Sequence, residues 1–261
     1  EILGINPARI RSALKAGKIA VVAGFQGATS EGDVRTLGRG GSDTSAVALA
    51  SALKAEKVEI YSDVDGIANC DPRQISEAKF LDAVSVSQIL SMANEGSKVI
   101  HPRAIKAALR TQTTIVVRNT FSNAPGTTIF HGTAAEDSLQ VALAHRDEMS
   151  LLVFEAETDA DKLVPEMIRV DEYRFVLKND VYLGIRVKEL QNKYGALRKE
   201  NGWATISVVF DKSAPESISP LETEIIPSSK NVICYLLKED YLTSSLRILY
   251  GHYISDLSTQ T

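Results

Sequence analysis

Apolar residues in the first half of the chain fall into short continuous runs and longer helical stretches. Ile19 to Ala23 is a valine-containing apolar run, which is typical of a strand buried on both faces. After a glycine-containing loop, alanine and leucine dominate from Asp43 to Ala55 and predict a helix, with Ser42 or Asp43 as its cap. Val58 to Tyr61 then predicts a second strand. The order strand, glycine loop, helix, strand is the repeating unit of a parallel sheet.

The remainder of the first half continues this pattern. Asn6 and Pro7 are placed to cap and begin a surface helix, because proline fits the first helical turn. Two further helices are expected at residues 85–95 and 103–110, and a β-branched strand is expected at Thr114–Val117. We therefore expect an α/β first half, in which a mainly parallel sheet carries helices on both faces.

After about residue 146 the pattern changes, since glycine becomes sparse and strands with charged flanks alternate with short helices. The expected strands are Leu151–Glu155, Tyr173–Leu177, Thr205–Phe210 and Val232–Leu237. Residues 211–221 are rich in serine and proline and predict a surface loop. The boundary is expected between His145 and Glu148, which gives one domain over residues 1–146 and a smaller one over residues 147–261.

Composition narrows the class of protein. Hydrophobic residues make up 44% and the net charge is −4, as in a globular protein, and no apolar run has the length of a membrane span. Lysine and arginine are scattered among more numerous acids, which argues against a nucleic-acid partner. Cys70 and Cys234 are too few and too far apart in the sequence for a disulfide framework or a four-ligand zinc site, so a reducing cytoplasm fits best.

The segment TLGRGGSDT, residues 36–44, joins the first strand to the helix that follows. Glycines let a ligand approach the backbone, and a helix start offers free N–H groups to an anion. Two glycines also suit a simple tight turn, and that alternative stays open. Arg39 favours a binding site, because a guanidinium clamps a carboxylate through two hydrogen bonds.

A second polar segment, SDVDGIANCDPR, follows the second strand at residues 62–73, where open α/β sheets bind their ligands. Asp63, Asp65 and Asp71 are candidates for ribose hydroxyls or a metal, and Arg73 is a candidate for phosphate. Asp65 and Asp71 precede Gly and Pro in turn-forming pairs, so they are the first candidates for a structural role. Lys98 is a candidate nucleotide contact, with a solvated surface charge as the alternative.

Together these segments resemble the aspartokinases of the amino-acid kinase family. The matching stretches are GFQG at 24–27, TLGRGGSDT at 36–44, SDVDGIANCDPR at 62–73, GSKVIHPRA at 96–104 and GTTI at 126–129. The resemblance is continuous over roughly residues 1–130. It implies that the first half is the C-terminal part of an amino-acid kinase domain, which transfers phosphate from ATP, with Mg²⁺ on its phosphates, to L-aspartate in lysine, threonine and methionine synthesis.

The resemblance also implies roles for single residues. On the substrate side, Arg39 would hold a carboxylate, Gly40, Gly41 and Ser42 would line the same pocket, and Phe25 would form its wall. Phosphoryl transfer depends mainly on such positioning and on charge neutralisation.

On the nucleotide side, Asp43 would organise the charges around the transferring group. Ser62 and Asp63 would meet the nucleotide, and Arg73 and Lys98 would contact its ribose or phosphates. No metal ion held directly by protein side chains is expected.

Three departures from the family pattern leave a second hypothesis open. The glycine-rich KFGG-type segment with its lysine is expected upstream and is not in the sequence, Ala68 replaces an aromatic residue, and Ser91 replaces a glutamate. A catalytically inactive regulatory or assembly paralogue that retains the pocket is therefore the alternative. A sibling kinase acting on another small carboxylate is a third hypothesis.

By its position, the second half resembles the paired ACT domains of aspartokinases, which are small ferredoxin-like α+β modules. The implied functions are binding of an amino-acid effector, lysine or threonine, and assembly into a homodimer or higher oligomer. A module that only dimerises, without an effector, is the alternative, because a fold does not by itself supply a function.

Overall fold

The computed structural model describes residues 2–132, 141–215 and 219–255, which form two compact units. The first unit contains the described residues before residue 70 and from residue 79 to 132. The second contains residues 70–78 and those after 140. The excursion of residues 70–78 into the second unit was not expected from the sequence.

The first unit is built on a four-stranded sheet in the order β3-β5-β6-β4. The strands are β3 (Lys57–Ser62), β4 (Ala83–Ser85), β5 (Thr114–Asn119) and β6 (Thr127–Phe130). β3 pairs parallel to β5 and β4 parallel to β6, whereas β5 and β6 are antiparallel. The prediction of a mainly parallel sheet is confirmed.

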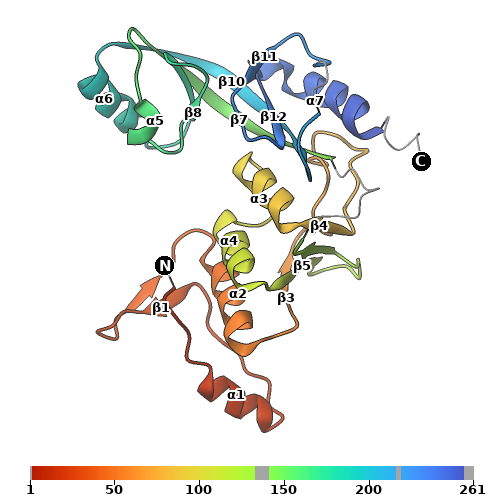
Figure 1. Ribbon diagram of the computed structural model, residues 1–261. Helices are drawn as coiled ribbons and strands as arrows, with labels where there is room; N and C mark the ends of the chain where they lie inside the picture. The colour runs from red at the N-terminus through yellow and green to blue at the C-terminus, as the bar shows by residue number, and fades with distance from the viewer. Residues whose placement is uncertain (1, 133–140, 216–218, 256–261) are drawn as a thin grey trace. The chain divides into compact units, whose positions relative to one another are not determined.

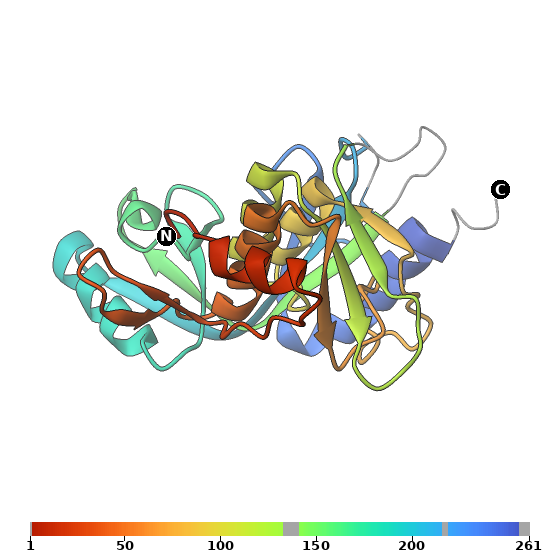
Figure 2. The same cartoon turned by 90° about the horizontal axis from the view of Figure 1, so that it is seen from below.

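Three helices cover this sheet, namely α2 (Gly41–Leu53), α3 (Val86–Asn94) and α4 (Pro102–Thr111). All lie on the same side of the sheet, as Figures 1 and 2 show. Ile115 and Val117 of β5 are fully buried, because alternate residues of the strand face these helices. The prediction of helices on both faces thus holds for one face within the described residues.

The N-terminal region contains α1 (Ala8–Lys15) and a hairpin of β1 (Gln26–Ala28) and β2 (Val34–Thr36). The predicted cap by Asn6 is wrong by one position, since Pro7 takes the N-cap position of α1 and the helix begins at Ala8. The side-chain oxygen of Asn6 still accepts a hydrogen bond of 3.1 Å from the N–H of Ala8.

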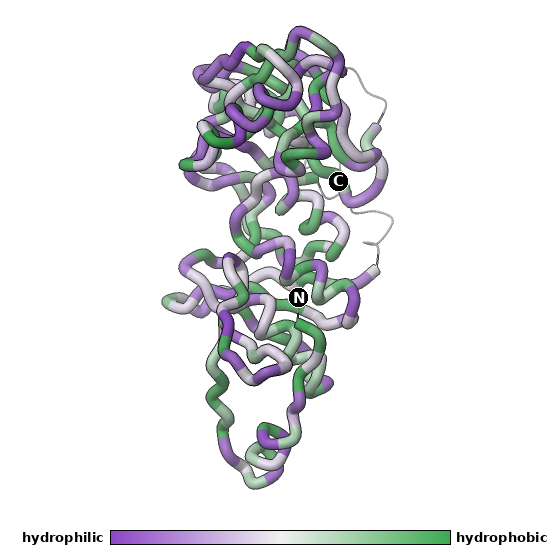
Figure 3. The backbone as a smooth tube through the Cα atoms, turned by 90° about the vertical axis from the view of Figure 1, so that its left-hand side faces the viewer, coloured by the Kyte–Doolittle hydropathy of each residue, from purple (hydrophilic) through white to green (hydrophobic). Residues whose placement is uncertain are grey.

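The buried strand predicted for residues 19–23 is wrong for this structure. The apolar run, green in the tube of Figure 3, has no strand partner among the described residues. Ile19 is 93% exposed and Val21 is 96% exposed. An apolar segment forms a strand only if a neighbouring strand satisfies its backbone N–H and C=O groups. The apolar pattern itself does not show whether such a neighbour is present.

The second unit is a six-stranded antiparallel sheet in the order β11-β12-β10-β7-β9-β8. The strands are β7 (Val141–Phe154), β8 (Ile168–Arg169), β9 (Arg174–Lys178), β10 (Leu197–Phe210), β11 (Glu224–Ile226) and β12 (Val232–Lys238). β7 runs without interruption through residues 145–148, where the sequence placed the domain boundary. The division between the units follows residue 140 instead.

Two separate cores lie along this sheet. The helices are α5 (Ala160–Leu163), α6 (Leu183–Tyr194) and α7 (Leu242–Tyr250), with short helical turns η1 (Glu239–Tyr241) and η2 (Gly251–Ser255). One core joins α5 and α6 to Phe154 and Phe175, and the other joins α7 to Phe210 and Tyr235. Irregular pairing between β7 and β10 near Trp203 separates the two halves. Each half therefore has its own hydrophobic core between sheet and helices.

The segment of residues 70–78 is part of the second core. Cys70 and Ile75 are buried in it, and Gln74 accepts a hydrogen bond of 2.8 Å from the hydroxyl of Thr243. At the base of the segment, the N–H of Asn69 donates to the carbonyl of Lys79, and the side-chain oxygen of Asn69 accepts from the N–H of Lys79. Both ends of the segment are therefore held together.

In the described ranges, none of the helices combines the length and the apolar character that a membrane crossing requires. Residues 216–218 of the predicted surface loop lie outside the described residues.

Candidate functional site

The start of α2 and the end of β3, which carry most of the expected site residues, lie at one edge of the first sheet. Residues 54–56 alone join α2 to β3, and residues 112–113 alone join α4 to β5. Each helix must therefore run antiparallel to the strand that follows it. As a result, the N-termini of both helices lie at the edge where β3 and β5 end, which is the edge that binds ligands in open α/β sheets.

The start of α2 is open to a ligand. The helix begins at Gly41, and Gly40 takes the N-cap position with φ +72° and no side-chain cap. The predicted cap by Ser42 or Asp43 is wrong, since both lie inside the helix. Their N–H groups make no backbone hydrogen bond within the described ranges. Uncapped N–H groups and the helix dipole favour an anion at this point.

Phe25 packs closely against this helix start. A Cβ added at Gly41 would lie 2.9 Å from Cδ2 of Phe25 and 2.9 Å from Cβ of Leu37, so only glycine fits between them. The carbonyl of Phe25 accepts a hydrogen bond of 2.9 Å from the N–H of Leu37. Phe25 has φ +66°, and such backbone strain in a large residue is common at functional sites.

Arg39 is exposed and makes no hydrogen bond or ion pair with the residues that the structure describes. Asp43 is half-buried and Ser42 is exposed. The guanidinium is thus available to a ligand beside the open helix start.

The end of β3 is fixed by its neighbour. The carbonyl of Ser62 accepts hydrogen bonds from the N–H of Thr120 at 2.8 Å and from its hydroxyl at 2.9 Å. The hydroxyl of Ser62 donates to a carboxylate oxygen of Asp63 at 3.0 Å. Asp63 itself is exposed, so its carboxylate is accessible to a hydroxyl group of a ligand.

Asp65 has the structural role expected for it. One of its carboxylate oxygens accepts hydrogen bonds from Ser122 and from Asn119, both at 2.7 Å. These two bonds, with Ser122 the larger effect, hold the pKa of Asp65 below its usual value. The carboxylate therefore ties the loop after β3 to the loop after β5.

Asp71 is also structural, as predicted. Both of its oxygens engage the guanidinium of Arg73, through Nε at 3.0 Å and Nη2 at 2.7 Å. The hydrogen bond to Arg73 is the main reason that the pKa of Asp71 is lowered. Arg73 belongs to the second unit, and its Nη1 is not used by Asp71.

Lys98 is exposed and has no hydrogen-bond or ion-pair partner in the described ranges. His101 and Arg103, which the sequence reasoning did not single out, lie against the loop that carries Arg39. Their only signal in the sequence is their place inside the segment GSKVIHPRA. Among the described residues, no cluster of three or more histidines, cysteines or acids is arranged to hold a metal ion.

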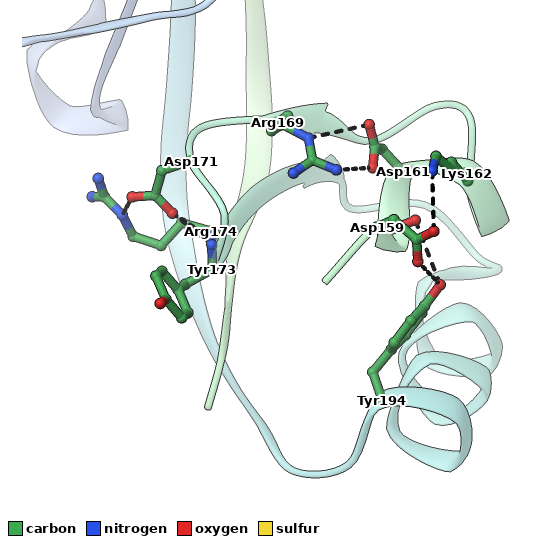
Figure 4. A network of polar contacts seen from close by, with 8 residues as sticks. All are labelled: Asp159, Asp161, Lys162, Arg169, Asp171, Tyr173, Arg174 and Tyr194. Atoms are coloured by element: carbon green, nitrogen blue, oxygen red, sulfur yellow. Dashed lines mark hydrogen bonds and ion pairs between the residues drawn. The ribbon is translucent and has the colours of Figure 1, made fainter. Parts of the chain in front are cut away.

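In the second unit, polar side chains gather around the loop between β7 and α5. Figure 4 shows Asp159 accepting a hydrogen bond from Tyr194 and pairing with Lys162. In the same view, Arg169 forms an ion pair with Asp161 at 2.6 Å. The hydroxyl of Thr158 is buried and has no hydrogen-bond partner in the described structure.

Comparison with known proteins identifies the first unit. The model of the amino acid kinase family matches residues 1–119. An aspartokinase of Thermus thermophilus is 52% identical over 129 residues, which is 49% of this chain and 32% of that protein. The chain thus spans about a third of the length of that relative.

Longer matches cover both units. An aspartokinase of Pseudomonas aeruginosa is 32% identical over 291 residues, covering 96% of this chain and 70% of that protein. Escherichia coli aspartokinase III, solved in complex with lysine and aspartate, has the same fold with a TM-score of 0.74. It is 24% identical, covering 95% of this chain and 63% of that one. Family-specific segments, fold and extended identity agree, and the chain belongs to the aspartokinase family.

Proposed function

We propose that the protein carrying this chain phosphorylates the side-chain carboxylate of L-aspartate with ATP, the first step of lysine, threonine and methionine synthesis. The observation that carries the proposal is the uncapped start of α2, where Arg39 stands without a partner among the described residues. A small dicarboxylate requires such a combination of cationic and N–H donors.

On the substrate side, Arg39 would hold the α-carboxylate of aspartate through two hydrogen bonds. Gly40, Gly41 and Ser42 would offer their backbone to the same ligand, and Phe25 would form one wall. The ring of Phe25 lies against Gly41 already, which supports this role.

On the nucleotide side, Asp63 would bind ribose hydroxyls beside Ser62, and Lys98 would meet a phosphate. Asp43, in the first turn of α2, would organise the charges near the transferring group. Arg73 stays a predicted nucleotide contact, because its Nη1 is still available when Asp71 holds the other two nitrogens.

The reaction needs little covalent help from the chain. A side-chain carboxylate oxygen of aspartate attacks the γ-phosphorus of ATP, the bond to the β-phosphate oxygen breaks, and ADP leaves, giving an acyl phosphate. Mg²⁺ would come with ATP and neutralise charge on its phosphates. What these residues supply is alignment of the two anions and compensation of their charges.

For the second unit, we propose binding of an amino-acid effector, lysine or threonine, and assembly into a homodimer or higher oligomer. The buried, unpartnered hydroxyl of Thr158 supports a ligand at the loop between β7 and α5. Val181, Tyr182 and Ile185, at and before the start of α6, are 88%, 59% and 60% exposed, which supports association through this unit.

Cys70 is buried and forms no disulfide bond, which supports a reducing cytoplasmic location.

Trapping of the product with hydroxylamine tests the proposed reaction. The natural protein that carries this chain is incubated with ATP, Mg²⁺ and L-aspartate, and the hydroxamate is measured. Hydroxamate that depends on both ATP and aspartate supports the proposal. Aspartate binding without turnover would instead favour the inactive regulatory paralogue.

A further inference from the structure

The loop that carries Arg39 is held from outside by the beginning of α4. Nη1 of Arg103 donates a hydrogen bond of 2.8 Å to the carbonyl of Leu37, which lies 66 positions earlier in the sequence. The N–H of Leu37 is also engaged, since it donates to the carbonyl of Phe25 at 2.9 Å. The residue that leads into the loop is therefore fixed through its donor and its acceptor.

His101 supports the same loop three residues further along, at Gly40. A Cβ added at Gly40 would lie 2.2 Å from Cγ and 2.5 Å from Cβ of His101. The imidazole thus lies directly against the backbone of Gly40. Arg39 is bracketed, because Arg103 holds the chain on one side of it and His101 contacts the chain on the other.

His101 is itself held in a defined orientation. Its side chain caps α4, with Nδ1 accepting a hydrogen bond of 3.2 Å from the N–H of Arg103. An accepting Nδ1 places the single ring proton of the neutral imidazole on Nε2. Burial lowers the pKa of His101, and the positive charges of Arg103 and Arg39 lower it further against the opposing effect of Asp43. The neutral form that can accept this bond is therefore favoured.

The distance between the N-termini of α2 and α4 is thus controlled by side chains of α4. The two helices also pack against each other. A clamp for a small dicarboxylate works only if its guanidinium and the helix N–H groups are correctly spaced, since a displacement of about 1 Å can cost about a hundredfold in rate.

We infer that Arg103 and His101 are positioning residues for the aspartate site, because they hold the loop from Leu37 to Gly40 so that Arg39 meets the substrate carboxylate at the start of α2. The inference rests on the proposed function for its substrate. The restraint of the loop by α4 is independent of the proposed function.

The test compares three variants of the natural protein, Arg103→Ala, Arg103→Lys and the control Lys106→Ala. Lys106 is exposed on the same helix and has no hydrogen-bond or ion-pair partner within the described ranges. We expect Arg103→Ala to raise the KM for aspartate by at least about tenfold while the KM for ATP changes less than about twofold. Arg103→Lys keeps a cationic donor for the carbonyl of Leu37 and should recover part of the loss.

Equal effects of Arg103→Ala on both substrates, or none on aspartate, would overturn the inference. Amide hydrogen exchange separates this failure from a failure of the proposed function, because it requires no activity. Arg103→Ala should speed exchange at Leu37 and Gly41, whose N–H groups are hydrogen-bonded to Phe25 and Gly38, and Lys106→Ala should not. Unchanged exchange in Arg103→Ala would overturn the inference even if the protein had no kinase activity.

Discussion

The hydroxyl of Tyr250 on α7 donates a hydrogen bond of 2.8 Å to the backbone carbonyl of Glu77, 173 positions earlier in the sequence. Glu77 belongs to the short segment 70–78 that joins the core of the second unit. Because Cys70 and Ile75 of this segment are buried beside α7, it contributes both polar and apolar contacts. A loop that leaves the first unit after Asn69 is thus a structural part of the second.

Removing the hydroxyl in Tyr250→Phe should destabilise the second unit by about 1 kcal/mol, since the Glu77 carbonyl loses this donor. Tyr241→Phe is the control, because Tyr241 is 63% exposed. Fluorescence of Trp203, the one tryptophan of the sequence, reports on this unit during urea unfolding. An unchanged midpoint in Tyr250→Phe would mean that this hydrogen bond does not contribute measurably to the stability of the second unit.

Cys70 should resist modification as long as the second unit stays folded. Burial raises the pKa of its thiol to about 12, so almost no thiolate is present at neutral pH. Labelling with a chromogenic disulfide reagent should be slow in buffer and complete in urea, as followed by absorbance and by mass spectrometry of the Cys70 peptide. Rapid labelling of Cys70 in native protein would contradict the burial of this segment.

Gly40→Ala should be much more disruptive than Gly17→Ala, although the two glycines have nearly the same backbone conformation, with φ +72° and +71°. A Cβ at Gly17 meets nothing within 4 Å, whereas a Cβ at Gly40 overlaps His101. Gly17→Ala should lower the free energy of unfolding by only about 1–2 kcal/mol, which is the cost of placing alanine in the left-handed conformation. The unfolding free energies of the two variants, measured by circular dichroism in urea, provide the comparison. Equal losses of unfolding free energy in the two variants would show that the side chain of His101 moves away from the added methyl group without an energetic penalty.

Asp65 should make the stability of the first unit depend on pH in acid. Its pKa in the folded protein lies below the ordinary value of 3.8, because Ser122 and Asn119 donate to the ionised carboxylate. The stabilisation is complete above the ordinary pKa and is lost as pH falls through the lowered one. Asp65→Asn removes this titration, so its stability should change less steeply than that of the wild type below about pH 4. Parallel stability curves for the two proteins would contradict the assignment.

Local signals in the sequence predicted much of the first unit. The spacing of apolar residues and the placement of glycines predicted the helix α2 and the strand β3. Asp65 and Asp71, which lie in turn-forming pairs, have the structural roles expected for them. These features depend on residues near one another in the chain. For the same reason the family segments located the edge of the sheet that carries Arg39 and Asp63.

Features that depend on distant partners were not predictable. The apolar run at residues 19–23 has the composition of a strand, but pairing decides its structure. The hydrogen bond from Arg103 to Leu37 and that from Tyr250 to Glu77 join residues 66 and 173 positions apart, and no local pattern encodes them. The cap of α2 was mispredicted because Ser42 and Asp43 are good capping residues, yet Gly40 accommodates the sharp left-handed turn that begins the helix.

The most direct test of the central claim is the aspartate dependence of hydroxamate formation by Arg39→Ala in the natural protein. Arg35→Ala is the matched control, since Arg35 is an exposed arginine of the same region whose ion pair is with Asp33. The account predicts a KM for aspartate at least about tenfold higher in Arg39→Ala, with the KM for ATP and the behaviour of Arg35→Ala close to wild type. An aspartate KM that is unchanged in Arg39→Ala would contradict the claim that this guanidinium binds the substrate.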